Sequence, residues 1–437
     1  MKKISIDLLA PPFKGHLHPI LSMGKQLLAH GFDVTVLSSE TAKVDIEAAG
    51  LRPLLLTSID DKILIECVNP AYAVRSSPTK LIAQFKQVIS FFRLLKTELE
   101  TIYAERSCDL MIADFTLPVA GIVADQNDIV WWTSMPSPCV IESSTGTPSY
   151  LGGWKESDSL PLKARDWLGR KLVRLFKRSA FYLCKKTIRS LGLDNIYRED
   201  GTEVIYSKHC ILCLGYQDFE FSKNWPKAAK FVGPMLYTPE ITDEPAHEAP
   251  MFQENKRYVL VTLGTHLDWC KKGIYQEVEK LSIQFPDVVF HFTDGNANND
   301  SYAKSHNQCF RFSYINYECY LPKYDFVIHH GGAGILYYCL QFEKPCIVIP
   351  QDYDQFDHAA RLEALNLSIW VKNVKEISIA LQTLLMGSCV AQSIKSFNER
   401  YANKNHNLAL LGLVESEIKR RDIENSGEQL YPVNTFF

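Results

Sequence analysis

Long apolar runs are missing from this sequence of 437 residues. No stretch reaches the roughly 18 to 20 consecutive apolar residues that a membrane span requires, so no transmembrane helix is predicted. The first residues, MKKISIDLLAPPFKG, place two lysines before an apolar stretch, but Asp7 interrupts that stretch. A short core strand is therefore favoured over a signal peptide, and we expect a cytoplasmic protein.

A large net charge is missing as well. The formal charge of −3 at pH 7 argues against general nucleic-acid binding. The twelve cysteines are scattered along the chain, and we expect them to be reduced, mostly buried thiols. No turn after a predicted strand has the form G-x-G-x-x-G, which disfavours a dinucleotide-dependent oxidoreductase.

What the chain does contain fits two globular domains. At roughly 100–200 residues per domain, the chain is too long for one ordinary domain. Its 46% hydrophobic and 22% charged residues are typical of a protein with sizeable buried cores.

One pattern of strand, turn and helix occurs twice. The first copy has an apolar strand, the turn PPFKGHLHP and a helical pattern over residues 20–29, and the second copy begins with YVLVTLGTH. The predicted strands cover residues 4–10, 33–37, 109–113 and 129–132, then 257–263, 288–292, 326–328 and 346–349. We predict an α/β fold with two doubly wound domains, residues 1–234 and 255–437, joined by a proline- and acid-rich linker at 235–254. The last helix of the chain is free to cross back to the first domain.

The strongest signal lies in residues 329–359, HHGGAGILYYCLQFEKPCIVIPQDYDQFDHA. Gly331, Gly332 and Gly334 let backbone N–H groups approach a phosphate, and a helix that begins there adds its positive end. The strand that follows ends at Pro350, so residues 354 and 355 lie in a loop beyond its carboxyl end, where parallel sheets bind ligands. The carboxylate and amide in this loop suit sugar hydroxyls.

At this point the chain resembles the GT-B fold UDP-glycosyltransferases, glycosyltransferase family 1, in particular the bacterial macrolide-type branch. The donor signature of that family runs H-x-G, a proline-bounded strand and D-Q-x-x-N-A. The residues that fall on it are His330, Gly332, Pro345, Pro350, Asp354, Gln355 and Ala359.

The resemblance implies two Rossmann-like domains that face a central cleft, with the acceptor held by the first domain and the donor by the second. It implies an inverting hexosyltransferase that moves a hexose, with glucose favoured, from a UDP-sugar to a hydroxyl of a lipophilic small molecule or lipid. A TDP-sugar stays open as the donor. No cofactor or metal is expected.

His16 is the candidate general base, because it falls on the G-H-x-x-P motif of the family and follows the first strand. An imidazole titrates near neutral pH and can take a proton from an acceptor hydroxyl. His18 does not match the motif, and a packing role is favoured for it. In the family an aspartate at the end of a strand supports the base, and Asp114 fits that place best, with a helix-capping role as the alternative.

The donor diphosphate is expected to contact the second domain. Gly264 and Thr265 match the glycine-serine turn of the family, and His330 would stabilise the leaving group together with the turn formed by Gly331, Gly332, Ala333 and Gly334. Asp354 and Gln355 are expected to contact the donor sugar. The sequence DYD at 352–354 resembles a metal-binding D-x-D, but its place in this loop favours the sugar role.

Three tyrosines take the expected nucleotide positions and depart from the family pattern. Tyr314 replaces a tryptophan that stacks on the base, Tyr317 replaces a glutamine, and Tyr338 replaces a glutamate that holds the ribose. One phenolic hydroxyl cannot accept two hydrogen bonds as a carboxylate does. His358 replaces the asparagine of D-Q-x-x-N-A, and the sequence does not explain that change.

The acceptor region is expected in residues 131–154, an aromatic, proline-broken segment that suits loops around a mostly apolar pocket, with core packing as the alternative. Residues 163–189 hold ten Lys or Arg and one Asp among apolar residues, which predicts a basic amphipathic helix. Packing of its apolar face on the first domain is favoured over peripheral contact with the inner face of a membrane.

Two other functions fit parts of the pattern. A GT-B sugar-nucleotide epimerase shares the architecture, but its motifs do not appear in the sequence. A non-catalytic glycosyltransferase-like auxiliary protein would keep the donor fold, and the retention of His16 and Asp114 argues against it.

Overall fold

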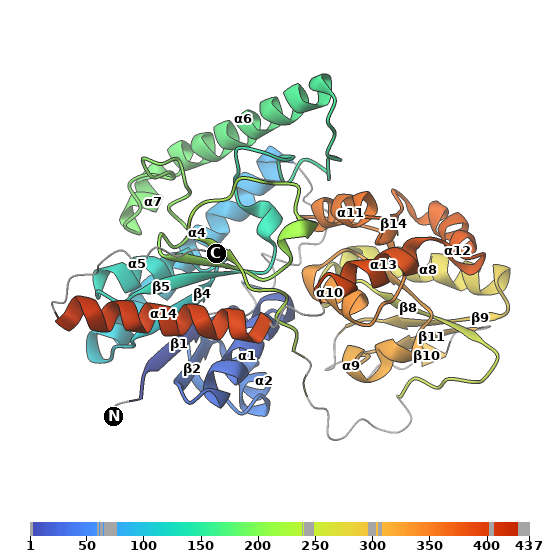
Figure 1. The fold of residues 1–437 in the computed structure, drawn as a ribbon, viewed down its shortest axis with the longest axis horizontal. Helices are drawn as coiled ribbons and strands as arrows, with labels where there is room; N and C mark the ends of the chain where they lie inside the picture. The colour runs from blue at the N-terminus through green and yellow to red at the C-terminus, as the bar shows by residue number, and fades with distance from the viewer. Residues whose placement is uncertain are drawn as a thin grey trace.

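The computed structural model describes residues 3–58, 61, 64, 77–237, 239, 249–295, 303–304, 308–401 and 406–426. The expected linker therefore lies in part outside the described residues. Figure 1 shows two α/β bodies side by side, the first coloured blue to green and the second yellow to orange. The two predicted doubly wound sheets are both present, one in each body.

The first domain is built on a seven-stranded sheet in which all neighbouring strands are parallel. The sheet order is β3 (Arg52–Leu55), β2 (Asp33–Ser38), β1 (Ser5–Leu9), β4 (Leu110–Asp114), β5 (Trp131–Met135), β6 (Cys210–Cys213) and β7 (Ala229–Phe231). Its helices are α1 (Lys14–Ala29), α2 (Lys43–Ala48), α4 (Pro78–Glu105), α5 (Pro118–Gln126), α6 (Leu160–Leu183) and α7 (Lys185–Ser190), with 3-10 turns η1 (Glu40–Ala42), η2 (Pro138–Val140) and η3 (Gln217–Phe219).

Both faces of this sheet are covered, because successive side chains of a strand point to opposite sides. Leu8 and Ile112 belong to the core cluster on one face, and Leu9 and Met111 belong to the cluster on the other. The strands are therefore buried on both sides, which explains why they read as nearly continuous apolar runs in the sequence.

The second domain has a seven-stranded sheet with one antiparallel edge pair, β10 with β11. The order is β10 (Ala303–Lys304), β11 (Cys309–Phe312), β9 (Val288–Thr293), β8 (Arg257–Thr262), β12 (Phe326–His329), β13 (Cys346–Val348) and β14 (Ser368–Trp370). Its helices are α8 (Asp268–Gln284), α9 (Tyr317–Tyr320), α10 (Ala333–Gln341), α11 (Gln355–Ala364), α12 (Ile377–Leu385) and α13 (Val390–Glu399), with η4 (Leu321–Lys323) and η5 (Val374–Glu376).

In both sheets the chain reverses its direction of winding at one point. In the first sheet this switch lies between β1 and β4, and in the second it lies between β8 and β12. Loops that leave the two sides of such a switch diverge and open a crevice at the carboxyl ends of the strands. These are the loops that carry the residues predicted for catalysis and for the diphosphate.

The last helix, α14 (His406–Ser426), lies on the first domain although it follows the second in sequence, as the red ribbon in Figure 1 shows. Leu410 and Val414 are fully buried in the first-domain core. His30 and Glu415 are joined by a hydrogen bond of 2.8 Å between α1 and α14. The chain thus crosses between the domains twice.

Helix α1 begins earlier than the sequence predicts, at Lys14 instead of near residue 20. The sequence interpretation ended the turn at Pro19, but this proline lies inside the helix. Proline removes one backbone donor and disfavours a helix interior without forbidding it near the first turns. His16 is therefore a residue of the first helical turn.

The pair Cys210 and Cys213 has the spacing C-x-x-C, which can indicate a metal or redox pair. Both residues lie in strand β6, and a separation of three along an extended strand points their side chains to opposite faces. Accordingly Cys210 packs in one core cluster and Cys213 in another. Nearly all described cysteines are buried free thiols, as expected.

Among the described residues, no single helix has the length and apolar composition to cross a membrane. The segments Val374–Leu385 and Val390–Glu399 meet that criterion together, as a pair bent by 72°.

Candidate active site

His16 and Asp114 lie at the switch point of the first sheet. His16 follows β1 in the first turn of α1, and Asp114 is the last residue of the neighbouring strand β4. The imidazole Nδ1 lies 3.1 Å from each carboxylate oxygen of Asp114. The predicted pair is therefore brought together from positions 98 residues apart.

Asp114 is held in place by its own turn. Its side chain is 0% exposed, and Oδ1 accepts the backbone N–H of Thr116 at 3.0 Å and the hydroxyl of the same residue. The helix-capping alternative is wrong, since the N-cap residue of α5 is Leu117 and no side chain caps the helix; the carboxylate instead closes the turn before α5 while it also bonds His16. Asp109, at the opposite end of the strand, accepts the backbone N–H and hydroxyl of Ser5 and so lies away from His16.

The electrostatics of His16 suit a general base. Burial lowers its pKa, but the charge and hydrogen bond of Asp114 raise it more, and Asp354 adds to the rise, so the pKa of His16 is raised. Because Nδ1–H donates to the carboxylate, Nε2 carries the lone pair that can accept a proton. The His16 side chain is 28% exposed, so a ligand can reach it.

His266 of the second domain lies opposite this pair and was not predicted. Its ring makes an edge contact with Phe13 at 5.0 Å between centroids. Burial, followed by the repulsion of His16, lowers the pKa of His266 to about 4. Its Nε2 is buried without a hydrogen-bond partner among the described residues. The signal was present in the sequence, since His266 directly follows the predicted phosphate turn at Gly264 and Thr265.

His330 and Gly264 meet at the switch point of the second sheet. Gly264 has a φ of +72°, and a side chain there would meet the His330 ring at 2.9 Å, so glycine is required at this position. Burial lowers the pKa of His330 to about 4, and its Nδ1 has no hydrogen-bond partner in the described part of the chain. A neutral imidazole has only one N–H, and the hydrogen bond of this ring to the backbone of Thr262 opposes the fall in its pKa.

The glycine turn before α10 is fixed by two histidines. Gly331 has a φ of +93°, its N–H donates to His329 Nδ1 at 3.0 Å, and its carbonyl accepts from His358 Nδ1 at 2.8 Å. His358 lies on α11, so this bond ties the turn to the helix of the DQ loop. The residue whose identity the sequence did not explain therefore holds the turn in position.

The N-terminus of α10 is open toward a ligand. Gly332 is its N-cap residue, and the first N–H groups of a helix have no partner within that helix. A side chain added at Gly334 would meet nothing within 4 Å, so this face of the turn is free of protein atoms. The positive end of α10 thus points at open space, as a diphosphate site requires.

A buried ammonium group supports the turn after β8. Lys271 is 5% exposed, and its Nζ donates to the carbonyl oxygens of Asp294 at 2.8 Å and Thr265 at 3.2 Å. It also pairs with Asp268 at 2.9 Å. Its charge contributes to the lowered pKa values of both His266 and His330. Sequence alone gave no sign of this role, because Lys271 lies inside a helix of ordinary composition.

Asp354 and Gln355, the DQ pair, have different hydrogen-bond partners. Asp354 Oδ2 accepts the hydroxyl of Ser137, a residue of the first domain, at 2.5 Å. Gln355 Oε1 accepts the backbone N–H groups of Gln351 at 2.9 Å and Asp352 at 3.2 Å. Asp354 therefore faces the other domain, whereas the amide oxygen of Gln355 holds the loop together.

The three predicted nucleotide residues do not form one surface. The ring of Tyr314 faces the first domain, with Lys14 Nζ 4.7 Å from its centre. Tyr317 shares a hydrogen bond of 2.7 Å with the Thr262 hydroxyl, and its ring contacts Tyr338 at 5.7 Å. Tyr338 is 6% exposed and stacks on Phe342. Tyr317 and Tyr338 pack together, while Tyr314 alone extends toward the other domain.

Comparisons with known proteins agree with this geometry. Residues 272–403 match the Glycosyltransferase family 28 C-terminal domain. The NDP-glycosyltransferase YjiC of Bacillus subtilis (strain 168) is 22% identical over 403 residues, which cover 91% of this chain and 92% of that protein. The crystal structure of the Streptomyces sp. SF2575 glycosyltransferase SsfS6 in complex with thymidine diphosphate gives a TM-score of 0.66 at 15% identity, covering 94% of this chain and 99% of that one.

The chain is a glycosyltransferase of the GT-B fold. A Sterol 3-beta-glucosyltransferase of Debaryomyces hansenii is also similar, at 21% identity over 423 residues. The match covers 92% of this glycosyltransferase but 26% of that longer protein.

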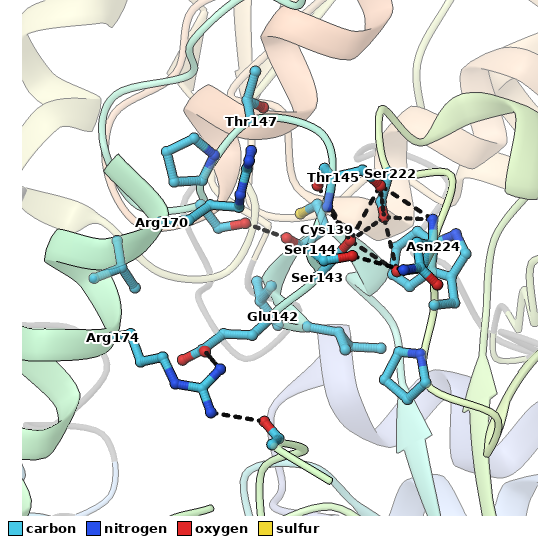
Figure 2. A pocket seen from close by; sticks show the side chains of 18 of the residues that line it. Cys139, Glu142, Ser143, Ser144, Thr145, Thr147, Arg170, Arg174, Ser222 and Asn224 are labelled. Carbon is cyan, nitrogen blue, oxygen red and sulfur yellow. Dashed lines mark hydrogen bonds and ion pairs between the residues drawn. The ribbon is translucent and has the colours of Figure 1, made fainter. Parts of the chain in front are cut away.

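The glycosyltransferase has a cavity of about 450 Å³ beside the site, between α6 and the loop that follows β5 (Figure 2). Its lining mixes hydroxyl and basic groups with apolar side chains, and its surface is more apolar than polar, in line with the mostly apolar pocket that was expected. Figure 2 shows Arg170 and Arg174 directed from α6 toward this loop, with Arg174 paired to Glu142 at 3.8 Å. The hydroxyl of Thr147, which is 8% exposed, has no partner among the described residues.

One cluster with metal-ligand chemistry lies behind the donor turn. His329, Cys339 and Cys346 are all buried, and their ligand atoms lie within 4.8 Å of one another. Burial lowers the pKa of His329 to about 3 and raises that of the Cys339 thiol well above its usual value. With an uncharged imidazole and a protonated thiol the group carries no buried charge, and the Nε2 of His329 has no hydrogen-bond partner among the described residues.

Proposed function

We propose that this glycosyltransferase moves a hexose, with glucose favoured, from a UDP-sugar to a hydroxyl group of a lipophilic acceptor with inversion at the anomeric carbon. A TDP-sugar is the alternative donor. The observation that carries the proposal is the His16–Asp114 pair at the first switch point, within electrostatic reach of Asp354 and His266 of the other domain. A cytoplasmic location is part of the proposal.

The chemistry assigned to His16 balances as one displacement. Nε2 takes the proton of the acceptor hydroxyl while that oxygen forms a bond to the anomeric carbon. The bond from this carbon to the diphosphate oxygen breaks, and the nucleoside diphosphate leaves with the electron pair. Asp114 stabilises the imidazolium that forms and keeps the ring oriented. Attack from the face opposite the leaving group inverts the anomeric configuration.

The leaving group is assigned to the second switch point. The open N-terminus of α10 offers backbone N–H groups and a partial positive charge to the diphosphate. The charge of a bound diphosphate favours protonation of His330, and the protonated ring supplies one further N–H from Nδ1. Together they provide the charge stabilisation that a divalent cation supplies in other transferases, which supports the proposal that no metal is needed. The thymidine diphosphate complex of SsfS6 supports a nucleoside diphosphate as the ligand of this fold.

The acceptor is assigned to the cavity beside α6. Tyr150 lines that cavity, and its backbone N–H donates to Asp357 Oδ2 at 2.9 Å, three residues after Asp354. The cavity therefore reaches the loop that carries the donor-sugar residues. Its size is within the range of small-molecule sites, and the name of the sterol-glucosylating relative supports a lipophilic acceptor.

The deciding experiment is an activity screen. Calorimetric titration with UDP- and TDP-sugars identifies the donor, and mass spectrometry of products from a mixed library of lipophilic alcohols identifies the acceptor class. The anomeric configuration of the product is then read by nuclear magnetic resonance. Retention of configuration, or donor binding with no product from any acceptor, contradicts the proposal.

Chelation tests the metal assignment. EDTA should leave turnover nearly unchanged, because the charge of the diphosphate is met by N–H groups. Loss of turnover on chelation, with recovery on addition of magnesium or manganese, contradicts this expectation. Recovery with zinc alone would instead direct attention to the His329 cluster.

A further inference from the structure

Helix α6 presents an apolar stripe to solvent. Leu168, Leu172 and Leu175 are 53%, 52% and 60% exposed, and their spacing of four and three residues places them on one side of the helix. The expectation that this apolar face packs on the first domain is therefore wrong for these residues. The further exposed apolar side chains of the helix are Leu160, Leu162, Trp167, Tyr182 and Leu183. Figure 1 shows α6 along the outer edge of the molecule.

Basic side chains border the stripe. Arg178 is exposed one helical turn after Leu175, and Lys171 is exposed one turn after Leu168, at the edge of the helix that also lines the cavity. The only acidic residue in α6 is Asp166, which is 5% exposed and paired with Arg165 at 2.6 Å. The outward face of α6 thus offers apolar groups and cations but no carboxylate.

The opposite side of α6 is fixed to the protein, so the orientation of the stripe is determined. Arg170 donates to the carbonyl of Gly146, and Arg174 donates to the carbonyl of Gly201 at 3.0 Å. A side chain at Gly169 would meet the Trp154 ring at 2.6 Å, so the helix approaches this loop as closely as glycine allows. Rotation of α6 to bury the leucines would break all of these contacts.

We propose that the outer face of α6 docks on the surface of an anionic lipid bilayer. The helix has 24 residues and is therefore about 36 Å long at about 1.5 Å per residue, a straight and uninterrupted surface that matches a flat bilayer. Apolar side chains enter the headgroup boundary, and Lys and Arg side chains reach lipid phosphates at its level. The missing carboxylates favour an anionic lipid surface over a protein partner of mixed charge.

Docking places the bilayer beside the acceptor cavity, because the inner side of the same helix lines that cavity with Arg170 and Arg174. A lipophilic acceptor can then pass from the membrane boundary to the site. This consequence rests on the proposed function, whereas the docking itself does not.

Co-sedimentation of the full chain with vesicles tests the proposal. Binding is expected to vesicles of phosphatidylglycerol and phosphatidylcholine and to weaken in pure phosphatidylcholine or at high salt. The triple variant Leu168→Gln, Leu172→Gln, Leu175→Gln should lower the affinity for these vesicles by about ten-fold or more. The matched control Val44→Gln, Ile283→Gln, Ile379→Gln removes apolar groups on other elements that are even more exposed, and it should bind as the wild type does. Arg178→Gln should reduce binding to the anionic vesicles only.

Three results overturn the proposal: no binding of the wild type to anionic vesicles, equal binding by the leucine variant, or self-association in sedimentation velocity that the leucine variant abolishes. The last result would assign the stripe to a second copy of the chain. Titration of the leucine variant with UDP confirms that it is folded. Vesicle binding without glycosyl transfer would support the docking and contradict the proposed function. Glycosyl transfer without vesicle binding would support the proposed function and contradict the docking.

Discussion

His16 and Asp114 are expected to contribute to turnover in different ways, His16 as the proton acceptor and Asp114 through the pKa of His16. His16→Ala should lower kcat by about 10²–10⁴-fold, because it removes the proton acceptor, while donor affinity changes little since the donor is bound by the other domain. Steady-state kinetics and donor titration measure the two quantities. His18→Ala is the matched control on the same helix: burial lowers the pKa of His18 to about 3, and its ring packs on Tyr237, so turnover should persist. Loss of donor binding in His16→Ala would contradict the division of roles.

Asp114 should also set the pH at which turnover falls. Burial alone would lower the pKa of His16, and Asp114 raises it, so Asp114→Asn should lower that pKa and reduce kcat. The base acts in its unprotonated form, and its activity falls as pH drops through its pKa. The acidic limb of kcat against pH should therefore shift to lower pH in Asp114→Asn. An unshifted limb would mean that the limb reports another group.

The open space at Gly334 allows a test of the diphosphate site without damage to the fold. Gly334→Ala adds a methyl group that meets no protein atom within 4 Å, so the thermal midpoint should not fall. If the diphosphate lies against the N-terminus of α10, the methyl group takes its place, and UDP affinity should fall by about ten-fold or more. Gly273→Ala, at an equally open position in α8, is the control and should bind UDP normally. Equal affinity in both variants would place the diphosphate elsewhere.

The loop between β13 and α11 separates sugar recognition from loop stability. Asp354→Ala should weaken binding of the intact nucleotide-sugar by about ten-fold and barely affect UDP, because its carboxylate is the group that faces the first domain. Gln355→Ala leaves two backbone N–H groups without their acceptor, at about 1–3 kcal/mol each, so it should also lower stability and weaken both ligands. Competition titration and thermal unfolding distinguish the two. An equal loss for both ligands in Asp354→Ala would remove its sugar role.

Several elements could be read from the sequence because their signal is local. The strands of both sheets are apolar runs. The pairing of His16 with Asp114 came from the family resemblance, and the structure places the two side chains 3.1 Å apart at the switch point. The start of α1 was missed because Pro19 argues for a turn, although the helix tolerates it. Short strands such as β7 and β14 were missed because three residues carry no period.

Other features depend on contacts between distant segments, which no local pattern encodes. His358 bonds the carbonyl of Gly331, 27 residues away, and its role becomes visible only when α11 lies against the turn. The stripe on α6 has the composition of a packed amphipathic helix. Only the bonds of Arg170 and Arg174 on its other side show that the leucines face outward.

The two domains are held together by a buried ion pair and a close backbone approach. Arg361 of α11 donates to Glu220 of the first domain at 2.7 Å, and their side chains are 3% and 1% exposed. A side chain at Gly153 would meet the Phe356 carbonyl at 2.1 Å, so the loop of the first domain rests directly on α11. Removing one partner of a buried ion pair costs about 3–5 kcal/mol. The ion pair of Arg361 and Glu220 therefore joins α11, which follows the donor loop, to the first domain, and Arg361 also lines the acceptor cavity.

Asp357 makes this contact sensitive to pH. Its Oδ2 accepts the Tyr150 N–H across the domain boundary, its Oδ1 is buried without a partner among the described residues, and burial raises its pKa to about 6 although Arg361 opposes the rise. An unfolded aspartate titrates near about 3.9, so the folded protein binds the proton more tightly, and stability falls as pH rises from about 4 to about 6. Asp357→Asn keeps the acceptor oxygen and removes the charge. Its thermal midpoint, relative to the wild type, should therefore increase with pH over this range and level off above it. The gain in the free energy of unfolding is about 3 kcal/mol at most, from roughly 1.4 kcal/mol per pKa unit.

Asp158→Asn, at an exposed carboxylate, is the control and should show no such trend. A constant difference between Asp357→Asn and the wild type from pH about 4 to about 7 would show that the carboxyl group does not titrate at the domain contact.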